Sequence, residues 1–355
     1  MAYTTIDDPS AYFQTALWTG NGSARSITLD GNSDMQPDWV WIKRRNSARN
    51  HALLDSVRGG SKQLVSNSNA AEGTDAQLIT SFDSDGFSLG TSNDCNSSGD
   101  TFVGWSWKAS GSTASNTDGS ITSTVSANTT AGFSIVSYTG TNSTATVGHG
   151  LGVTPSMIIV KNRSATQNWI VYHQAIGNTG AIYLNATNAT NTSSGWFNNT
   201  SPTSSVFTVG TFDAINGSSH NLIGYCFAEK KGYSKFGSFV ANGQTGTNGS
   251  FIYLGFKARW FMWKNTSTGD STFDHWNLID TKRQTYNGNT ADGYVQADSS
   301  TAETSFSGNG LTVLSNGVQI SQGGRYHSNS GDTYIFMAFA ESPFVTSTGI
   351  PTTAR

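Results

Sequence analysis

The densest group of charges that could do chemistry in this sequence is the basic run Lys43, Arg44, Arg45 and Arg49. Guanidinium groups form strong, paired hydrogen bonds with phosphate and carboxylate groups. The run could therefore hold a phosphate, an acidic sugar or an acidic neighbouring subunit. The alternative is a solvated turn after the apolar stretch "WVWI". Because only the lysine recurs at matching positions further along the chain, we assign it a structural role. The three arginines are the candidate residues for a subunit or ligand contact.

Residues that could catalyse a reaction are few. No two of the four glutamates stand out as the facing carboxylates that a glycosidase needs. The six histidines show no HxH or HExxH spacing, and the nucleophile motif GxSxG is absent. Cys95 and Cys226 form no CxxC motif, which argues against a disulfide framework and a structural zinc site. The sequence therefore predicts no catalytic residue, no cofactor and no metal.

Aromatic residues are the other candidates for binding. Ten tryptophans are many for a chain in which only 12% of residues are charged, and those within apolar runs are expected in the core. Trp18 and Trp196 instead lie in polar, glycine-rich surroundings. An exposed ring there could stack on a sugar or fill a protein interface. The alternative is a loop tryptophan folded back over a small core. Both remain candidate binding residues.

Composition limits the partners. The formal net charge is -3 over 355 residues, which gives no reason to expect nucleic acid or an anionic membrane surface. No run approaches the 18 apolar residues of a membrane helix, so membrane insertion is not expected. The start "MAYTTIDDPSAYF" lacks the basic and apolar regions of a signal peptide.

Four motifs recur three times in the same order. From the first copy to the second they are displaced by 118, 118, 120 and 120 residues, and from the second to the third by 103, 107, 104 and 112. Such nearly constant offsets are hard to obtain by chance and indicate three copies of one domain of about 100 residues. The aligned anchors are Lys43, Lys161 and Lys264; Asp55, His173 and Asp280; Phe87, Phe207 and Leu311; and Trp107, Phe227 and Phe339.

Within each copy the pattern is typical of β-strands. "WVWIK", "MIIVK" and "WFMWK" are short apolar runs rich in aromatic and β-branched residues, as in strands buried on both faces. Clusters of Gly, Asn, Asp and Ser separate the runs. We therefore expect an all-β protein of three tandem antiparallel β-sandwich or jelly-roll-like repeats. The expected segments are repeats at 1–109, 133–231 and 232–345, a Ser/Thr-rich linker at 110–132 and a C-terminal tail at 346–355.

One acidic motif has two readings. Asp83-x-Asp85-Gly86 resembles the start of a calcium-binding loop, which would need further oxygen ligands and a terminal glutamate. The residues that follow read as a strand, so a tight hairpin at Asp85-Gly86 is favoured.

The wording of the first copy resembles a repeat domain of virion proteins from marine tailed phages, which are often labelled tail-fibre or lectin-like (concanavalin-type sandwich) proteins. The resemblance covers residues 1–109 best and weakens in the later copies. It implies a structural role in the particle and brings no catalytic residues. The segments that carry it are "AYFQTALWTGNG", "QPDWVWIKRRN", "LLDSVRGGSKQLVSN", "ITSFDSDGFSLG" and "FVGWSWKA".

We therefore expect a non-enzymatic structural virion protein, located on the tail or the capsid surface, whose partners are other virion proteins. The first choice is a tail fibre or spike component that contacts the host surface, with a glycan or another receptor as ligand. The alternatives are a capsid decoration or head-fibre protein and a polysaccharide-degrading enzyme. A homotrimer and a pseudo-threefold monomer both remain open.

Overall fold

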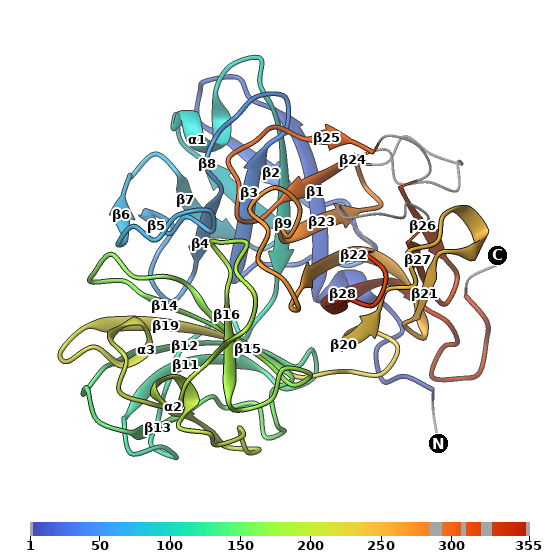
Figure 1. Ribbon diagram of the computed structural model, residues 1–355. Coiled ribbons are helices and arrows are strands. Elements are labelled where there is room, and N and C mark those ends of the chain that lie inside the picture. Colours follow the sequence, from blue (N-terminus) through green and yellow to red (C-terminus); the bar gives the residue numbers. More distant parts are fainter. Residues whose placement is uncertain (1–2, 284–292, 307–309, 321–328, 353–355) are drawn as a thin grey trace.

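The structure is a computed structural model that describes residues 3–283, 293–306, 310–320 and 329–352 (Figure 1). Antiparallel strands form nearly all of its regular structure, so the predicted all-β class is confirmed. No helix in the described part of the chain is long and apolar enough to cross a membrane. The helical segments described are single turns: η1 (Pro9–Ala11), α1 (Asn93–Asn96), α2 (Ser194–Phe197), α3 (Asp213–Asn216) and η2 (Gly246–Asn248).

Three segments build main sheets with the same strand order. In each, the strand that contains the anchor lysine lies between the next strand and the last long strand, which in turn pairs with an early strand. We refer to these segments as unit one (3–109), unit two (110–231) and unit three (232–345). Their division into three tandem domains stays a prediction. The shared order is β1 (Phe13–Thr19), β9 (Thr101–Trp107), β3 (Trp39–Arg44) and β4 (Ala52–Asp55) in unit one; β12 (Phe133–Thr139), β19 (Asn221–Phe227), β14 (Met157–Asn162) and β15 (Ile170–His173) in unit two; and β20 (Ser234–Val240), β28 (Thr333–Pro343), β22 (Phe256–Asn265) and β23 (Asn277–Asp280) in unit three.

Shorter strands extend and cover these main sheets. Two strands follow β15 and two follow β23 in their sheets: β16 (Gly180–Tyr183), β17 (Asn191–Thr192), β24 (Gly293–Gln296) and β25 (Thr304–Ser305). β5 (Lys62–Gln63) pairs with β6 (Gly73–Thr74). Each unit also has a small second sheet: β2 (Arg25–Thr28), β8 (Gly86–Leu89) and β7 (Ile79–Asp83); β13 (Ala145–Gly148) and β18 (Val206–Val209); and β21 (Ser250–Tyr253), β27 (Gly317–Ile320) and β26 (Leu311–Leu314).

The small sheet and the main sheet of each unit enclose a hydrophobic core of their own. In unit one, for example, Ile27 and Phe87 of the small sheet share a cluster with Val40, Ile42 and Phe102 of the main sheet. Units two and three have corresponding clusters. Each unit is therefore built like a small sandwich.

The strand order corrects one of the aligned anchors. The central strand of the small sheet is β8 in unit one and β27 in unit three, whereas Leu311 lies on the outer strand β26. Val318 of β27 therefore corresponds to Phe87, because each pairs with the central residue of the edge strand, Ile252 and Ile27 respectively. The sequence alignment misplaced this anchor because β26 and β27 are neighbouring strands with similar apolar sequences.

The Ser/Thr-rich segment 110–132, interpreted as a linker that could add an edge strand through "SITSTVS", does contribute strands. It contains β10 (Ala114–Asn116) and β11 (Ser123–Asn128), which add to the main sheet of unit two beside β12. The alternation in "STVSAN" places Ser123 and Val125 in buried positions. A Ser/Thr-rich composition therefore conceals a strand here, because serine and threonine pack well on a covered sheet.

The opposite faces of the three main sheets meet in one central core. Trp39 and Trp41 of β3 point into it, whereas Val40 and Ile42, which alternate with them, belong to the core of unit one. This alternation explains why the four residues before the lysine in "WVWIK" and its counterparts are all apolar. The rings contact one another across the units: Trp39 lies 4.4 Å from Tyr225, Trp107 lies 5.6 Å from Trp260, and Phe227 lies 6.0 Å from Phe339 between centroids. The three units thus pack together rather than form a string (Figure 1).

The shared core predicts that the three units unfold together. Replacing Trp39, which contacts rings of units one and two, with alanine should lower the free energy of unfolding by about 3–5 kcal/mol, measured by urea denaturation. Val153→Ala, at an exposed position of unit two, should change it by less than about 0.5 kcal/mol. Separate transitions, with only one affected by the tryptophan change, would contradict a common core.

Candidate functional site

The arginines predicted to form a contact are engaged within the chain. Arg44 forms an ion pair with Asp100 (Nη1 to Oδ2, 3.0 Å), and Arg49 forms one with Asp94 (2.5 Å). Both partners belong to unit one. Arg44 also donates to the carbonyl of Asn93 and lies over the ring of Phe102. These two arginines thus fasten the loops at one end of unit one.

Arg45 reaches a different unit. Its Nε donates to Oε2 of Glu303 in unit three at 2.5 Å. Arg163 of unit two makes the corresponding contact with Glu72 of unit one, donating from both Nε (2.7 Å) and Nη2 (3.0 Å) to the carboxylate. The arginine contact predicted from the sequence is, for Arg45, a contact between units of one chain. Whether these arginines also contact another subunit or a ligand stays a prediction.

The three anchor lysines are fully buried and join the units in a cycle. Each donates from Nζ to a backbone carbonyl oxygen of another unit, in the order one to three, three to two and two to one. Burial lowers the pKa of each of the three ammonium groups to about 8. The contacts are Lys43 with Ser300 (3.2 Å), Lys264 with Thr187 (2.9 Å) and Lys161 with Asn69 (3.0 Å).

A second set of contacts follows the same cycle. The residues that open the "HALLD", "WIVYH" and "WNLID" motifs contact carbonyl oxygens of the next unit: His51 with Gln296 (3.0 Å), Trp169 with Val65 (2.9 Å) and Trp276 with Tyr183 (2.8 Å). His51 is neutral, because burial lowers its pKa to about 3. Its Nδ1 accepts from Trp41 at 2.8 Å, so its Nε2 carries the proton given to Gln296.

The residues that close these motifs form a third set. In units one and three they are aspartates, each held by a buried arginine three residues later: Asp55 by Arg58 (2.6 Å) and Asp280 by Arg283 (2.5 Å). In unit two the corresponding residue is His173, the buried last residue of β15. The contacts with other units are Tyr225 hydroxyl to Asp55 (2.7 Å), Trp105 Nε1 to Asp280 (3.0 Å) and His173 Nε2 to the carbonyl of Phe336 (3.1 Å).

The two tryptophans chosen as binding residues are buried, each 7% exposed. Trp18 stacks on Phe102, and its indole nitrogen donates to the carbonyl of Cys95 at 2.9 Å. Trp196 packs edge-on against Phe212 and donates to Asn191 at 2.8 Å. The exposed rings expected at these positions are therefore not present. Polar surroundings in the sequence misled here, because residues of the same unit that are distant in sequence pack against both rings.

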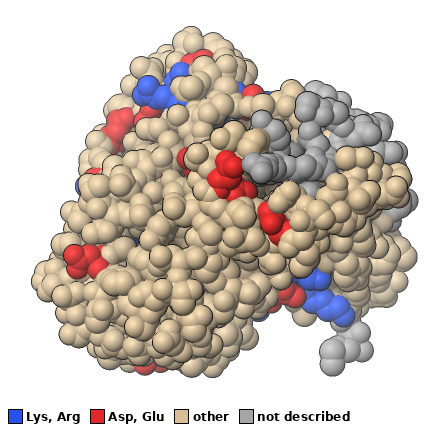
Figure 2. All heavy atoms as spheres, in the orientation of Figure 1, with Lys and Arg blue, Asp and Glu red and all other residues tan. Residues whose placement is uncertain are grey.

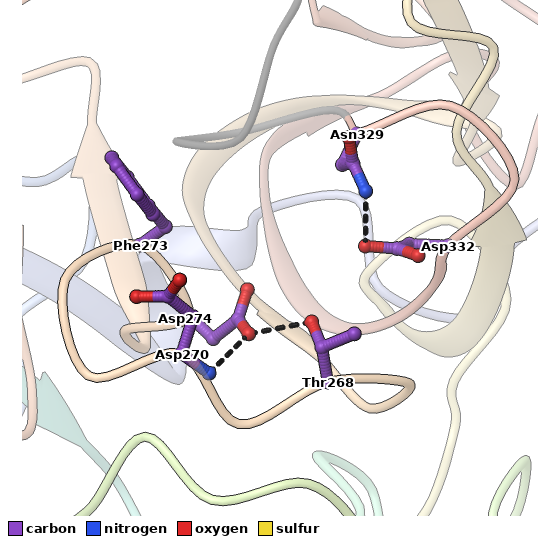
Figure 3. Close-up of a pocket in the computed structure, with 6 residues that line it drawn as sticks. All are labelled: Thr268, Asp270, Phe273, Asp274, Asn329 and Asp332. Carbon is purple, nitrogen blue, oxygen red and sulfur yellow. Dashed lines mark hydrogen bonds between the residues drawn. The ribbon is translucent and has the colours of Figure 1, made fainter.

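An acidic pocket of about 150 Å³ lies in unit three (Figure 3). Its carboxylates accept hydrogen bonds from residues of the surrounding loops. Asp274 accepts from the hydroxyl of Thr268 (2.6 Å) and the amide of Asp270 (2.8 Å), and Asn329 donates to Asp332 (2.9 Å). Asn265 donates to both Asp274 and Asp332. The pocket thus ties loops together, and the described residues contain no group of three or more His, Cys, Asp or Glu able to hold a metal ion.

One exposed surface is not explained by folding. Phe251 and Tyr253, on the edge strand β21, are 47% and 51% exposed. The Nζ of Lys235 lies 5.0 Å from the Tyr253 ring centroid, and that of Lys231 lies 4.6 Å from the ring of Tyr3. We call these five residues the Tyr253 face. It is the strongest candidate for a contact with another molecule, since exposed aromatic residues mark binding surfaces.

Sequence reasoning missed the Tyr253 face, although a signal for it exists. The strand "SFIY" alternates, and its buried residues are Ser250 and Ile252, so its two aromatic residues must point outward. The corresponding strand of unit one, "RSIT", carries serine and threonine at the outward positions. Comparing these two strands would have shown the difference. The two lysines belong to the segment "EKKGYSKFG", where unit two passes into unit three.

Fold and contacts together define an all-β protein whose three sandwich-like units close around a common aromatic core. Charged side chains are sparse on the face shown in Figure 2. The chain belongs to the family described as "Domain of unknown function (DUF7483)", whose model matches residues 8–343 and so extends across all three units. No curated protein and no solved structure matches the chain.

The buried lysines predict a specific dependence of stability on pH. Their pKa is about 8 in the folded chain and 10.5 when unfolded, so the unfolded chain binds more protons between these values. The free energy of unfolding should therefore rise from pH 7 to pH 9, by on the order of 1 kcal/mol for each lysine. Burial raises the pKa of Cys95 and Cys226, which opposes the rise from about pH 9 upward. Urea denaturation at pH 7, 8 and 9 measures the change.

Replacing the three lysines with methionine provides the control. This triple variant should lose the rise between pH 7 and 9 whatever its absolute stability. A rise of the same size in the variant would show that other groups cause it.

Proposed function

We propose that this chain is a non-enzymatic structural protein of a tailed-phage particle, and that it serves as a tail fibre or spike component contacting the host surface. The observation that carries the proposal is the division of roles between buried ionisable side chains and exposed aromatic rings. Buried ionisable side chains join one unit to the next, while the rings of Phe251 and Tyr253 remain about half exposed and are not among those buried contacts. A rigid body with a separate contact surface suits a particle component.

The buried ionisable groups also argue against catalysis. A catalytic acid or base must reach a substrate and must exchange protons during the reaction. His51 and His173 are buried, and the pKa values of both, about 3 and about 4, keep them neutral at pH 7. Glu72 and Glu303 are paired with arginines of other units. This use of the groups supports a structural role over that of a polysaccharide-degrading enzyme.

A capsid decoration or head-fibre role is the second candidate. The specific observation in its favour is the cyclic order of the contacts, one to three, three to two and two to one. Contacts of this head-to-tail kind close into rings. A single chain of three such units would match the outline of a trimer and could sit at a threefold position of a capsid.

Electron microscopy of intact particles labelled with an antibody against this chain tests both roles. We expect label at the distal tail for a fibre or spike component, because that part meets the host. Label distributed over the head would favour the capsid role. Particles that carry no label, although the antibody recognises the folded chain, would reject a virion role altogether. Release of reducing sugar from host polysaccharide by the purified chain would instead support the enzyme.

A further inference from the structure

The three units provide an internal control for what folding requires of the small sheet. Its edge strand has an inward residue in each unit, Ile27, Val147 and Ile252, and all three are buried. The outward residues on either side are free to differ. They are Ser26 and Thr28 in unit one, Thr146 and Gly148 in unit two, and Phe251 and Tyr253 in unit three. The fold itself thus accepts small residues at these positions.

The aromatic side chains of unit three are held in place on the outer surface of the sheet. Phe251 lies over Gly317 of the neighbouring strand β27, where an added Cβ would meet its ring at 2.9 Å. The hydroxyls of Tyr3 and Tyr253 both lie near Gly255, and Tyr3 donates to its carbonyl oxygen at 2.6 Å. The rings therefore form a positioned platform rather than loose surface residues.

Two ammonium groups border this platform. Lys235 donates to the carbonyl oxygen of Tyr253 at 2.9 Å while lying over its ring, and Lys231 lies over the ring of Tyr3. Within the described residues, neither lysine forms an ion pair with a carboxylate. Some other surface cations of the described chain are paired, as Lys257 is with Glu341 and Arg49 with Asp94. The Tyr253 face therefore combines exposed rings with positive charge that no described carboxylate neutralises.

This combination matches one class of ligand. The axial C–H groups of a pyranose make one side of the sugar apolar, so it packs flat on an aromatic ring, and an ammonium group pairs with a carboxylate or sulfate. A protein partner would need roughly 800 Å² from each side, far more than two half-exposed rings provide. We infer that the Tyr253 face binds an anionic polysaccharide, one that carries uronate or sulfate groups. The expectation that this polysaccharide lies on a host surface rests on the proposed function.

Binding of the full chain to defined polymers tests the inference. Isothermal titration calorimetry with alginate, a polyuronate, and with chondroitin sulfate should show binding to at least one, and neutral dextran should show none. The affinity should fall as salt rises from about 50 to about 500 mM, because salt screens exposed charges. Poly-glutamate supplies negative charge without sugar rings, so equal binding to it would overturn the inference in favour of an acidic protein or simple charge attraction.

Substitutions taken from unit one make the matched variant. Phe251→Ser with Tyr253→Thr introduces the residues that unit one carries at the same positions, so the fold should be kept, and circular dichroism and the urea midpoint verify this. Affinity for the anionic polymer should drop at least about tenfold. Lys231→Gln with Lys235→Gln should weaken binding and reduce its dependence on salt. Val153→Ser, at an exposed apolar position of unit two, should change nothing.

The outcomes also separate this inference from the proposed function. A folded chain that binds neither alginate nor chondroitin sulfate, or a double aromatic variant that binds as well as the unchanged chain, would overturn the polysaccharide site. Antibody label on the particle would still support the virion role in that case. Conversely, binding that depends on Phe251 and Tyr253, together with unlabelled particles, would keep the site and reject the virion role.

Discussion

The constraint on which the rest of this structure depends is that each main sheet is buried on both faces. One face packs on the small sheet of its own unit, and the other packs on the two remaining units in the central aromatic core. A strand in this position cannot alternate apolar and polar residues. It instead alternates between two apolar environments, so Trp39 and Trp41 belong to the shared core while Val40 and Ile42 belong to unit one. Close packing also has a cost, since the buried indole N–H groups of Trp39, Trp107 and Trp260 find no hydrogen-bond partner among the described residues.

Polar contacts at the edge of the core set how the units meet. A buried ammonium group is costly unless it is hydrogen-bonded, and each anchor lysine finds carbonyl oxygens both in its own loop and in another unit. Every residue has a backbone carbonyl whatever its side chain is. This contact therefore occurs in all three units, although the surrounding residues differ. The contacts that use side chains are less uniform: aspartate and arginine in units one and three give way to His173 in unit two. The contact between a lysine and a backbone carbonyl is thus more uniform among the three units than the contacts between side chains.

Much of this arrangement could be predicted from the sequence because its anchors are the contacts between units. The lysines and the "HALLD", "WIVYH" and "WNLID" motifs recur at nearly constant spacing, since each must reach the neighbouring unit. The predictions that failed concern burial, which depends on chain segments distant in sequence. Trp18 is buried by Phe102 and the carbonyl of Cys95, which belong to the same unit but lie far away in the sequence. The residues next to Trp18 in the sequence do not indicate this burial. The partner of Arg45, Glu303, lies 258 residues away, and the displaced anchor at Leu311 became visible only through strand pairing.

Repetition also helps to separate folding from function. Where three units keep a residue type, as at the lysines, the fold accounts for it. Where one unit departs at a position that the others fill with small side chains, folding does not demand the change. The edge strand of unit three departs in this way, because Phe251 and Tyr253 stand where unit one has Ser26 and Thr28. Exposed aromatic rings of this size mark binding surfaces, which agrees with the inferred contact with another molecule. The individuality of unit three, rather than the motif that all three units share, is therefore where binding should be sought.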